Sequence, residues 1–105
     1  MHASIWKLEG DPADLLDRYD SMLAEIPTAS MHLHLCLRAE DGIVIIDTCP
    51  SREAFHQFTG SETFRAMLAH HGLPFPAQLD DYPVHAAIIE GRATAGAPAA
   101  TQQSA

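Results

Sequence analysis

The residues best suited to chemistry lie in the stretch MHLHLCLRAEDGIVIIDTCPS, residues 31–51. His32 and His34 alternate there with leucines, and Asp47 follows a second apolar run. Histidine changes charge near neutral pH, and a neighbouring carboxylate fixes its tautomer and raises its basicity. These residue types therefore favour general acid–base catalysis, with His34 as the catalytic base and Asp47 as its orienting partner.

Two other chemistries remain open for the same stretch. His32 and His34 are two residues apart on a strand, so both imidazoles project to one side and could bind a transition metal with a nearby sulfur or carboxylate. No CxxC or HExxH spacing supports such a site. Cys36 or Cys49 could act as a nucleophile, and Cys49 precedes a predicted helix whose dipole would lower its pKa. In the plainest alternative, all these side chains are ordinary polar residues of a half-buried strand.

A β-hairpin is expected to carry these residues. Period-two alternation predicts two strands here, and Asp41-Gly42 between them is a strong signal for a two-residue turn. With that turn, His34 faces Cys49, and Asp47 lies diagonally from His34. A three-residue loop would instead flip one strand and place Asp47 among leucines, where burying a carboxylate is costly.

The two faces of this hairpin differ in character. One face is largely apolar, and the other mixes polar and ionisable groups with one isoleucine. The apolar face consists of Met31, Leu33, Leu35, Leu37, Val44, Ile46 and Thr48. The mixed face consists of His32, His34, Cys36, Arg38, Ile45, Asp47 and Cys49.

Four strands and two helices are expected along the chain, in the order β-α-β-β-α-β. Strands are predicted near 2–8, 31–39, 43–48 and 83–90, and helices near 12–26 and 51–71, the second interrupted at Gly60. This order is typical of a ferredoxin-like α+β fold, an antiparallel four-stranded sheet with both helices on one face. Residues 1–92 would form this single domain, and the small and polar residues 93–105 would form a disordered tail.

Both faces of such a sheet need a cover. We expect the apolar face to meet the same face of a second subunit in a homodimer, because a large apolar patch is typical of an interface. The mixed face would then lie under the helices, although the opposite assignment remains open. His34 and Asp47 would work in a pocket there. Four further side chains would contact the substrate: Trp6, His32, His71 and His85.

Charge and composition argue against several function classes. The formal net charge is −8, with only six lysines and arginines, which are scattered along the chain. Nucleic acids and anionic membranes bind clustered cationic surfaces, so neither is expected as a partner. No apolar run approaches the length of a membrane span, and the N-terminus lacks a signal-peptide pattern. We therefore expect a cytoplasmic protein whose two cysteines are reduced thiols.

The short βαββαβ pattern with an uncovered sheet face resembles the dimeric α+β barrel superfamily, which includes the antibiotic biosynthesis monooxygenases and the stress-responsive A/B barrel proteins. The most specific local similarity is SREAFHQFTGSETFRAM, residues 51–67, and the resemblance covers residues 2–91. It implies a homodimer and a pocket between sheet and helices. Members that act as cyclases or cofactor-free monooxygenases use histidines and tyrosines to deprotonate phenols and 1,3-dicarbonyl compounds.

Together, these observations predict an enzyme without a cofactor, in which His34 and Asp47 abstract a proton from a small aromatic or polyketide-like substrate. One alternative is a non-enzymatic homodimer that binds a small hydrophobic ligand. Another is a metal protein that uses His32 and His34. An enzyme predicts an enclosed cluster of polar groups, whereas a binding module predicts an apolar pocket from which the histidines point apart.

Overall fold

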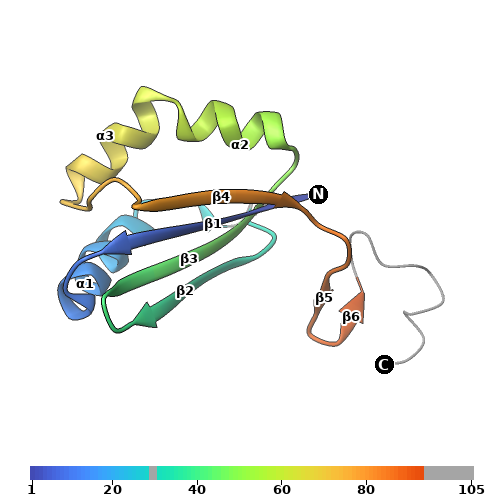
Figure 1. The fold of residues 1–105 in the computed structure, drawn as a ribbon, viewed down its shortest axis with the longest axis horizontal. Coiled ribbons are helices and arrows are strands. Elements are labelled where there is room, and N and C mark those ends of the chain that lie inside the picture. The colour runs from blue at the N-terminus through green and yellow to red at the C-terminus, as the bar shows by residue number, and fades with distance from the viewer. Residues whose placement is uncertain (29–30, 94–105) are drawn as a thin grey trace.

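A computed structural model gives the fold of this chain and describes residues 1–28 and 31–93 (Figure 1). The strands are β1 (His2–Glu9), β2 (His34–Ala39), β3 (Gly42–Cys49), β4 (Gln78–Pro83), β5 (Ile88–Ile89) and β6 (Arg92–Ala93). The helices are α1 (Pro12–Leu23), α2 (Arg52–Thr59) and α3 (Glu62–His70). Of the predicted disordered tail, Ala93 ends β6, and residues 94–105 lie outside the described residues.

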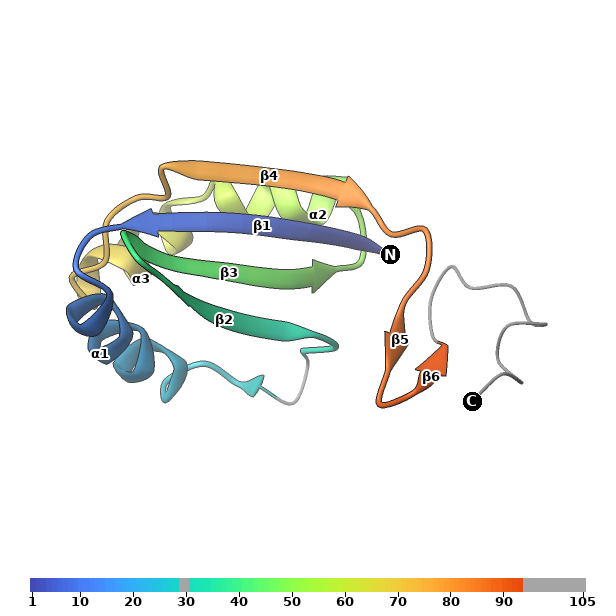
Figure 2. The ribbon, with the colours of Figure 1, turned by 60° about the horizontal axis from the view of Figure 1, so that its bottom comes forward.

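Four of the strands form one antiparallel sheet in the order β2-β3-β1-β4. The helices α1, α2 and α3 contribute to a core on one face of this sheet. Figure 2 looks onto the other face, with α2 and α3 behind the strands. The predicted α+β class and the four-stranded antiparallel sheet are thereby confirmed. The second predicted helix is divided into α2 and α3.

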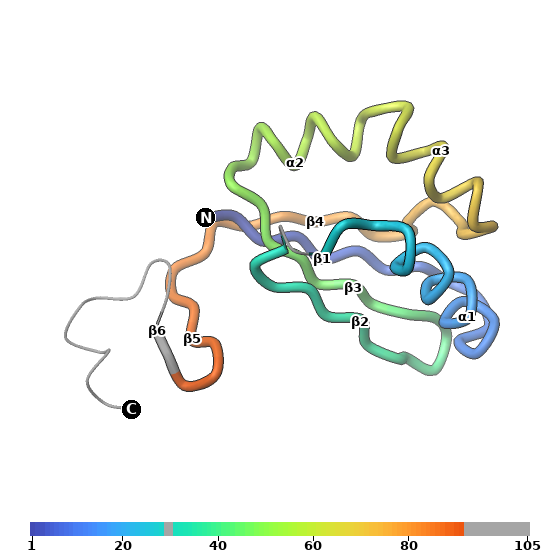
Figure 3. Tube along the Cα trace, turned by 180° about the vertical axis from the view of Figure 1, so that it is seen from behind, coloured from blue at the N-terminus to red at the C-terminus, as the bar shows by residue number. Residues whose placement is uncertain are grey.

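Side-chain caps explain where the helices begin. The carboxylate of Asp11 accepts a hydrogen bond from the Asp14 N–H at 3.0 Å, which caps α1. Ser51 and Ser61 cap α2 and α3 in the same way. Gly60 ends α2, and α3 follows on the same side of the sheet (Figure 3). None of the described helices has the length and apolarity needed to cross a membrane.

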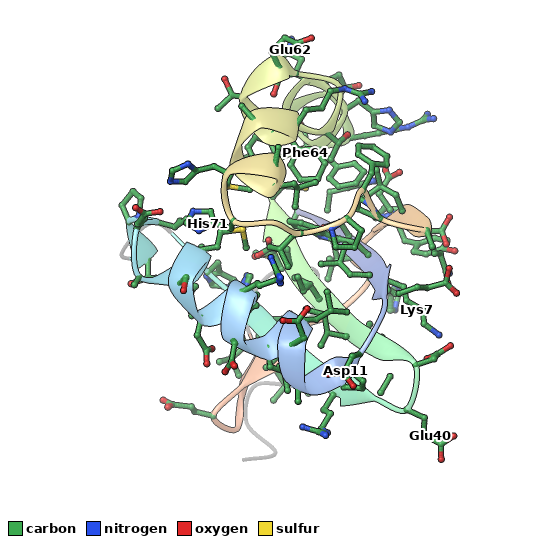
Figure 4. The ribbon with its side chains drawn as sticks, turned by 90° about the vertical axis from the view of Figure 1, so that its left-hand side faces the viewer. Lys7, Asp11, Glu40, Glu62, Phe64 and His71 are labelled. Atoms are coloured by element: carbon green, nitrogen blue, oxygen red, sulfur yellow. The ribbon has the colours of Figure 1, made fainter. Side chains whose placement is uncertain are left out.

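The hydrophobic core lies between the helices and the sheet. Phe64 of α3 is fully buried and meets Trp6 of β1 edge to face, with ring centroids 5.3 Å apart. Figure 4 shows Phe64 pointing from α3 toward the sheet. The buried apolar residues are Trp6, Leu8, Leu15, Tyr19, Met22, Ile43, Ile45, Phe55, Phe64, Leu68 and Leu73. Because Ile45 belongs to this core, the mixed face of the hairpin lies under the helices, as predicted.

The hairpin of β2 and β3 has the predicted faces but not the predicted register. His34 faces Asp47 directly, and not Cys49 as a two-residue turn at Asp41-Gly42 predicts. The observed pairing is shifted by two residues from the predicted one. Side chains alternate with a period of two, so a shift of two leaves each of them on its predicted face.

Gly42 accounts for the shift. Glu40 and Asp41 form the turn, and Gly42 is the first residue of β3. A Cβ at Gly42 would lie 2.0 Å from the carbonyl oxygen of Leu8, so only glycine lets β3 approach β1 this closely. The Asp41 carboxylate also binds the Lys7 ammonium at 2.9 Å, which holds the turn beside β1. Gly42 is therefore required for the close pairing of β3 with β1, and it is not one of the two turn residues.

The fourth strand of the sheet is Gln78–Pro83, so the prediction of a strand at 83–90 is wrong. Pairing with β1 begins soon after α3, where the Ala77 N–H donates to the Lys7 carbonyl at 2.8 Å. The aliphatic residues that favoured the later segment form β5, which pairs with β6 beyond the end of β4 (Figure 1). The later segment has the higher strand propensity, but pairing with β1 determines which residues form the fourth strand. His85, expected on the last strand of the sheet, consequently lies past its end.

The opposite face of the sheet is apolar and partly exposed. Leu35 and Leu37 on the edge strand β2 are 44% and 45% exposed. Their neighbours on this face are Ile5, Val44 and Ile46, which are partly buried. Leu35, Leu37, Val44 and Ile46 belong to the predicted apolar face of the hairpin, and Ile5 of β1 extends this apolar face across the sheet.

Candidate functional site

A row of polar side chains crosses the sheet beneath the helices. His34, Asp47, Ser4 and Asp81 occupy opposed positions on β2, β3, β1 and β4. Opposed residues share a face, so the four side chains lie next to one another in the order of the strands. This polar row brings two carboxylates, a hydroxyl and an imidazole under the helices.

At one end of the polar row, His34 connects Asp47 to Tyr19 of α1. The Nδ1 atom of His34 lies 2.9 Å from Oδ1 of Asp47, and its Nε2 atom lies 2.5 Å from the Tyr19 hydroxyl. The two rings are nearly parallel, with 8° between their planes. A neutral His34 that donates from Nδ1 to the carboxylate accepts at Nε2 from the tyrosine. Both ring nitrogens therefore have partners.

Tyr19 keeps its proton and acts as the donor in this chain of hydrogen bonds. Its side chain is buried, and burial, with smaller contributions from Cys36 and two carboxylates, raises the pKa of Tyr19 to about 12. A phenol with this pKa is neutral at pH 7. The hydroxyl therefore donates to His34, which fixes the imidazole with its other proton toward Asp47.

At the other end of the polar row, Asp81 meets two histidines. His2 Nε2 bonds to Oδ2 of Asp81, and His56 Nε2 of α2 lies 3.3 Å from Oδ1. His2 is buried, whereas His56 is exposed. Desolvation by itself would raise the pKa of Asp81, but the hydrogen bonds from both histidines outweigh it and lower that pKa. Asp81 is thus held as a carboxylate.

A cavity of about 240 Å³ lies between α2 and the sheet, next to Asp47. Its lining includes three aromatic rings and several polar groups, among them Ser4, Trp6, Asp47, Cys49, Phe55 and Phe58. The Trp6 indole N–H donates to the Ser4 hydroxyl oxygen at 3.3 Å. The hydroxyl proton of Ser4 is thereby directed away from the indole. We call this space the α2 cavity.

Asp47 lines the α2 cavity, whereas His34 does not. A ligand in the cavity would therefore meet the carboxylate, with the imidazole behind it. Asp47 could accept a proton from such a ligand, and the Ser4 hydroxyl could donate a hydrogen bond to a ligand oxygen. A carboxylate base next to a hydrogen-bond donor is suited to proton abstraction beside a carbonyl group.

The structure places Trp6 and the predicted orienting residue Asp47 together at the α2 cavity. It separates the other residues that were predicted to contact the substrate. His32 is exposed ahead of β2, His71 follows the end of α3, and His85 is exposed beyond β4. None of these three lines the α2 cavity. His85 is displaced because β4 ends earlier than predicted, and His71 because α3 ends at the far end of the sheet from this cavity (Figure 1).

Neither cysteine has the surroundings of a reactive thiolate. Burial, reinforced by Asp20, raises the pKa of Cys36. Burial, reinforced by Asp47 and Asp81, raises the pKa of Cys49 as well. The predicted lowering of the Cys49 pKa by the following helix is wrong, because desolvation and the nearby carboxylates oppose ionisation.

The geometry does not favour a metal site at His32 and His34. Both nitrogens of His34 are bonded within the protein, to Asp47 and Tyr19. Within residues 1–28 and 31–93, no set of three or more converging histidine, cysteine or carboxylate ligands includes His32 or His34.

Sequence reasoning missed the partners that complete the polar row. No role is predicted from the sequence for Ser4 or Asp81, and the contact of Tyr19 with His34 is not predicted either. The alternation in HASIWKLE places Ser4 on the same face as Trp6, which is a usable signal. Asp81 could be found only from the register of β4 against β1.

Comparison with known proteins does not narrow the function further. The sequence matches no protein-family model, and no match is found among curated proteins. The function is therefore inferred from the polar row and the α2 cavity.

Proposed function

We propose that this chain is a small-molecule enzyme of the dimeric α+β barrel type, which abstracts a proton from a small aromatic or polyketide-like substrate without a cofactor. The observation that carries this proposal is the chain of hydrogen bonds from Tyr19 through His34 to Asp47, which ends at the wall of the α2 cavity. The sheet order β4-β1-β3-β2 further supports the ferredoxin-like arrangement.

In this proposal Asp47 is the catalytic base and His34 is a positioning residue. The Asp47 carboxylate takes a proton from a carbon next to a carbonyl group, and the electron pair of the broken C–H bond moves into the carbonyl to form an enolate. His34 keeps one carboxylate oxygen bonded through Nδ1–H, so the other oxygen is directed to the substrate. For an isomerisation, Asp47 then returns the proton to a different atom of the substrate. For a cyclisation, the enolate carbon first attacks a second carbonyl group of the same substrate to form a C–C bond, and the resulting alkoxide takes the proton back from Asp47.

Ser4 is the proposed donor to the enolate oxygen. It lies opposite Asp47 in the register of β1 and β3 and lines the same cavity. Its oxygen accepts from the Trp6 indole N–H, which polarises the hydroxyl and leaves its proton for the substrate. A donor aimed at developing negative charge in an apolar site stabilises a transition state more than it would in water. Trp6, Phe55 and Phe58 supply an apolar wall suited to an aromatic substrate.

The proposal includes a homodimer formed by stacking two sheets through the apolar face. The helices pack on the other side of the sheet, so this face is open to a partner. An exposed aliphatic patch is most stable when it is removed from water, and a second copy offers a matching patch.

The decisive experiment is solvent deuterium exchange. The protein is incubated in heavy water with a panel of 1,3-dicarbonyl and phenolic compounds, and loss of the exchangeable carbon-bound protons is followed by NMR. We expect the wild-type protein to accelerate exchange for at least one compound. Asp47→Asn should reduce this acceleration by about 10²–10⁴, the usual contribution of a positioned base. Asp41→Asn, which changes an exposed aspartate in the turn of the same hairpin, should leave the acceleration unchanged.

A non-enzymatic ligand-binding protein is the second candidate. It is favoured by the full hydrogen bonding of His34, which uses both ring nitrogens within the protein. The same experiment separates the two candidates. NMR line widths show whether a compound binds. If a bound compound exchanges no faster with the wild-type protein than with Asp47→Asn, the result supports the binding protein and overturns the enzyme.

A further inference from the structure

Three potential metal ligands meet where α1 and α3 end. His71 Nε2 lies 2.6 Å from Oε2 of Glu25, and His70 Nε2 lies 4.0 Å from the same oxygen. One ligand atom from each residue lies within 4.8 Å of the other two, and no second group of this kind is found in residues 1–28 and 31–93. In Figure 4, His71 lies between the end of α3 and α1.

The backbone that carries the two histidines is held by a helix-terminating motif. The Gly72 N–H donates to the Ala69 carbonyl at 3.0 Å, and the Leu73 N–H donates to the Leu68 carbonyl at 2.8 Å. Gly72 has a φ of +68°, the left-handed conformation that this motif requires and that glycine adopts readily. Leu73 is buried in the core, and Arg18 of α1 donates to the Gly72 carbonyl at 3.4 Å. The end of α3 is therefore fixed beside α1.

The electrostatic surroundings favour a cation at this place. Glu25 follows the C-terminal end of α1, where the helix dipole disfavours a carboxylate and favours a positive charge. The last turn of α1 contains no basic residue that could compensate. His70 and His71 lie at the C-terminal end of α3, which presents the same polarity. The formal net charge of −8 strengthens the attraction.

We infer that Glu25, His70 and His71 bind a Zn²⁺ ion that links the ends of α1 and α3. Two imidazoles and a glutamate form a known ligand set for zinc, with water in the fourth position. Harder cations such as Mg²⁺ and Ca²⁺ prefer sites made entirely of oxygen ligands. The His71 side chain is only 10% exposed and serves as the fixed ligand, whereas Glu25 and His70 are 59% and 70% exposed and can rotate onto the ion.

Zinc binding is tested on the full chain, prepared without a polyhistidine tag. Zn²⁺ affinity is measured by competition with a chromophoric chelator, and Co²⁺ serves as a spectroscopic probe of the coordination number. We expect one Zn²⁺ per chain and Co²⁺ absorption typical of four ligands. Glu25→Gln and His70→Gln should each weaken Zn²⁺ binding by more than the roughly 10–100-fold that loss of an outer-shell partner costs. Both residues are exposed, so these variants should fold.

His85→Gln is the matched control, because His85 is also exposed but lies beyond β4. It should bind Zn²⁺ as the wild type does. A second measurement is the unfolding temperature, which Zn²⁺ should raise in the wild type and in His85→Gln but not in Glu25→Gln or His70→Gln. Equal Zn²⁺ affinity in the wild type and in the combined Glu25→Gln and His70→Gln variant would overturn the inference, as would a wild-type protein that binds no Zn²⁺.

Discussion

His34 and Asp47 face each other directly across β2 and β3, and Nδ1 of the histidine lies 2.9 Å from Oδ1 of the carboxylate. Tyr19 occupies the other ring nitrogen from the helix side. The imidazole is thus enclosed by two partners, and Asp47 is the member of the chain that reaches the α2 cavity. Because Asp47 and not His34 reaches the cavity, the carboxylate is the base in the proposed reaction. Residue types alone favoured the imidazole as the base.

The first prediction concerns the hydroxyl of Tyr19. Tyr19→Phe removes the donor to Nε2 of His34 and leaves a largely buried nitrogen without its partner, which costs about 1–3 kcal/mol of folding free energy. Urea unfolding should show this loss. Tyr82→Phe is the control, because Tyr82 is 56% exposed, and its free energy of unfolding should not change. An unchanged stability of Tyr19→Phe would mean that Nε2 has a partner other than the tyrosine.

The sequence predicts the hairpin faces well because they depend on a local rule. An error of two residues in the register moved the partner of His34 from Cys49 to Asp47, yet it left both side chains on the predicted face. The alternation of HLHLCLR therefore places His34 under the helices without knowledge of the turn. The contact with Asp47 depends on the register itself. That register follows from the close approach of Gly42 to Leu8, which lies outside the hairpin.

The last strand and the rest of the polar row depend on long-range contacts that local patterns do not contain. The segment QLDDYP has weaker strand propensity than the aliphatic run after it, but its pairing with β1 starts at Ala77 and Lys7. Asp81 enters the polar row only through this pairing, and His2 and His56 then bond to it. Residue types could suggest a histidine and carboxylate pair, but not the second pair at the other end of the row.

The second prediction concerns the pH dependence of stability. Hydrogen bonds from His2 and His56 lower the pKa of Asp81 in the folded protein. A group whose pKa is lower when folded contributes stability above its unfolded pKa, and that stability is lost as the pH falls through the folded pKa. The wild type should therefore lose stability as the pH falls below about 4, and Asp81→Asn should lose less over the same interval.

Urea unfolding midpoints, measured at a series of acidic pH values, check this difference in slope. Part of the slope should remain in Asp81→Asn, because the hydrogen bond from Lys7 also lowers the pKa of Asp41 despite opposing desolvation. Asp80→Asn is the neighbouring control, because it removes one carboxylate from the same strand without removing the partner of His2 and His56. Identical slopes for the wild type and Asp81→Asn would contradict the prediction.

The third prediction concerns the apolar face and the homodimer. Leu35 is 44% exposed in the single chain, so a polar residue there removes little from the hydrophobic core. In a dimer of stacked sheets the same position would be dry, and a carboxylate buried there would be strongly destabilising. Leu35→Asp should therefore give a folded monomer, whereas the wild type should be a dimer.

Sedimentation velocity over a range of protein concentrations measures the two masses, and circular dichroism reports whether Leu35→Asp is folded. Ala13→Asp is the matched control, because it adds the same charge at an exposed position of α1, on the helix side of the sheet. This variant should remain a dimer, which would show that charge alone does not dissociate the subunits. A dimer that persists in Leu35→Asp would place the interface elsewhere. A wild type that stays monomeric at every concentration would show that no second copy covers the apolar face.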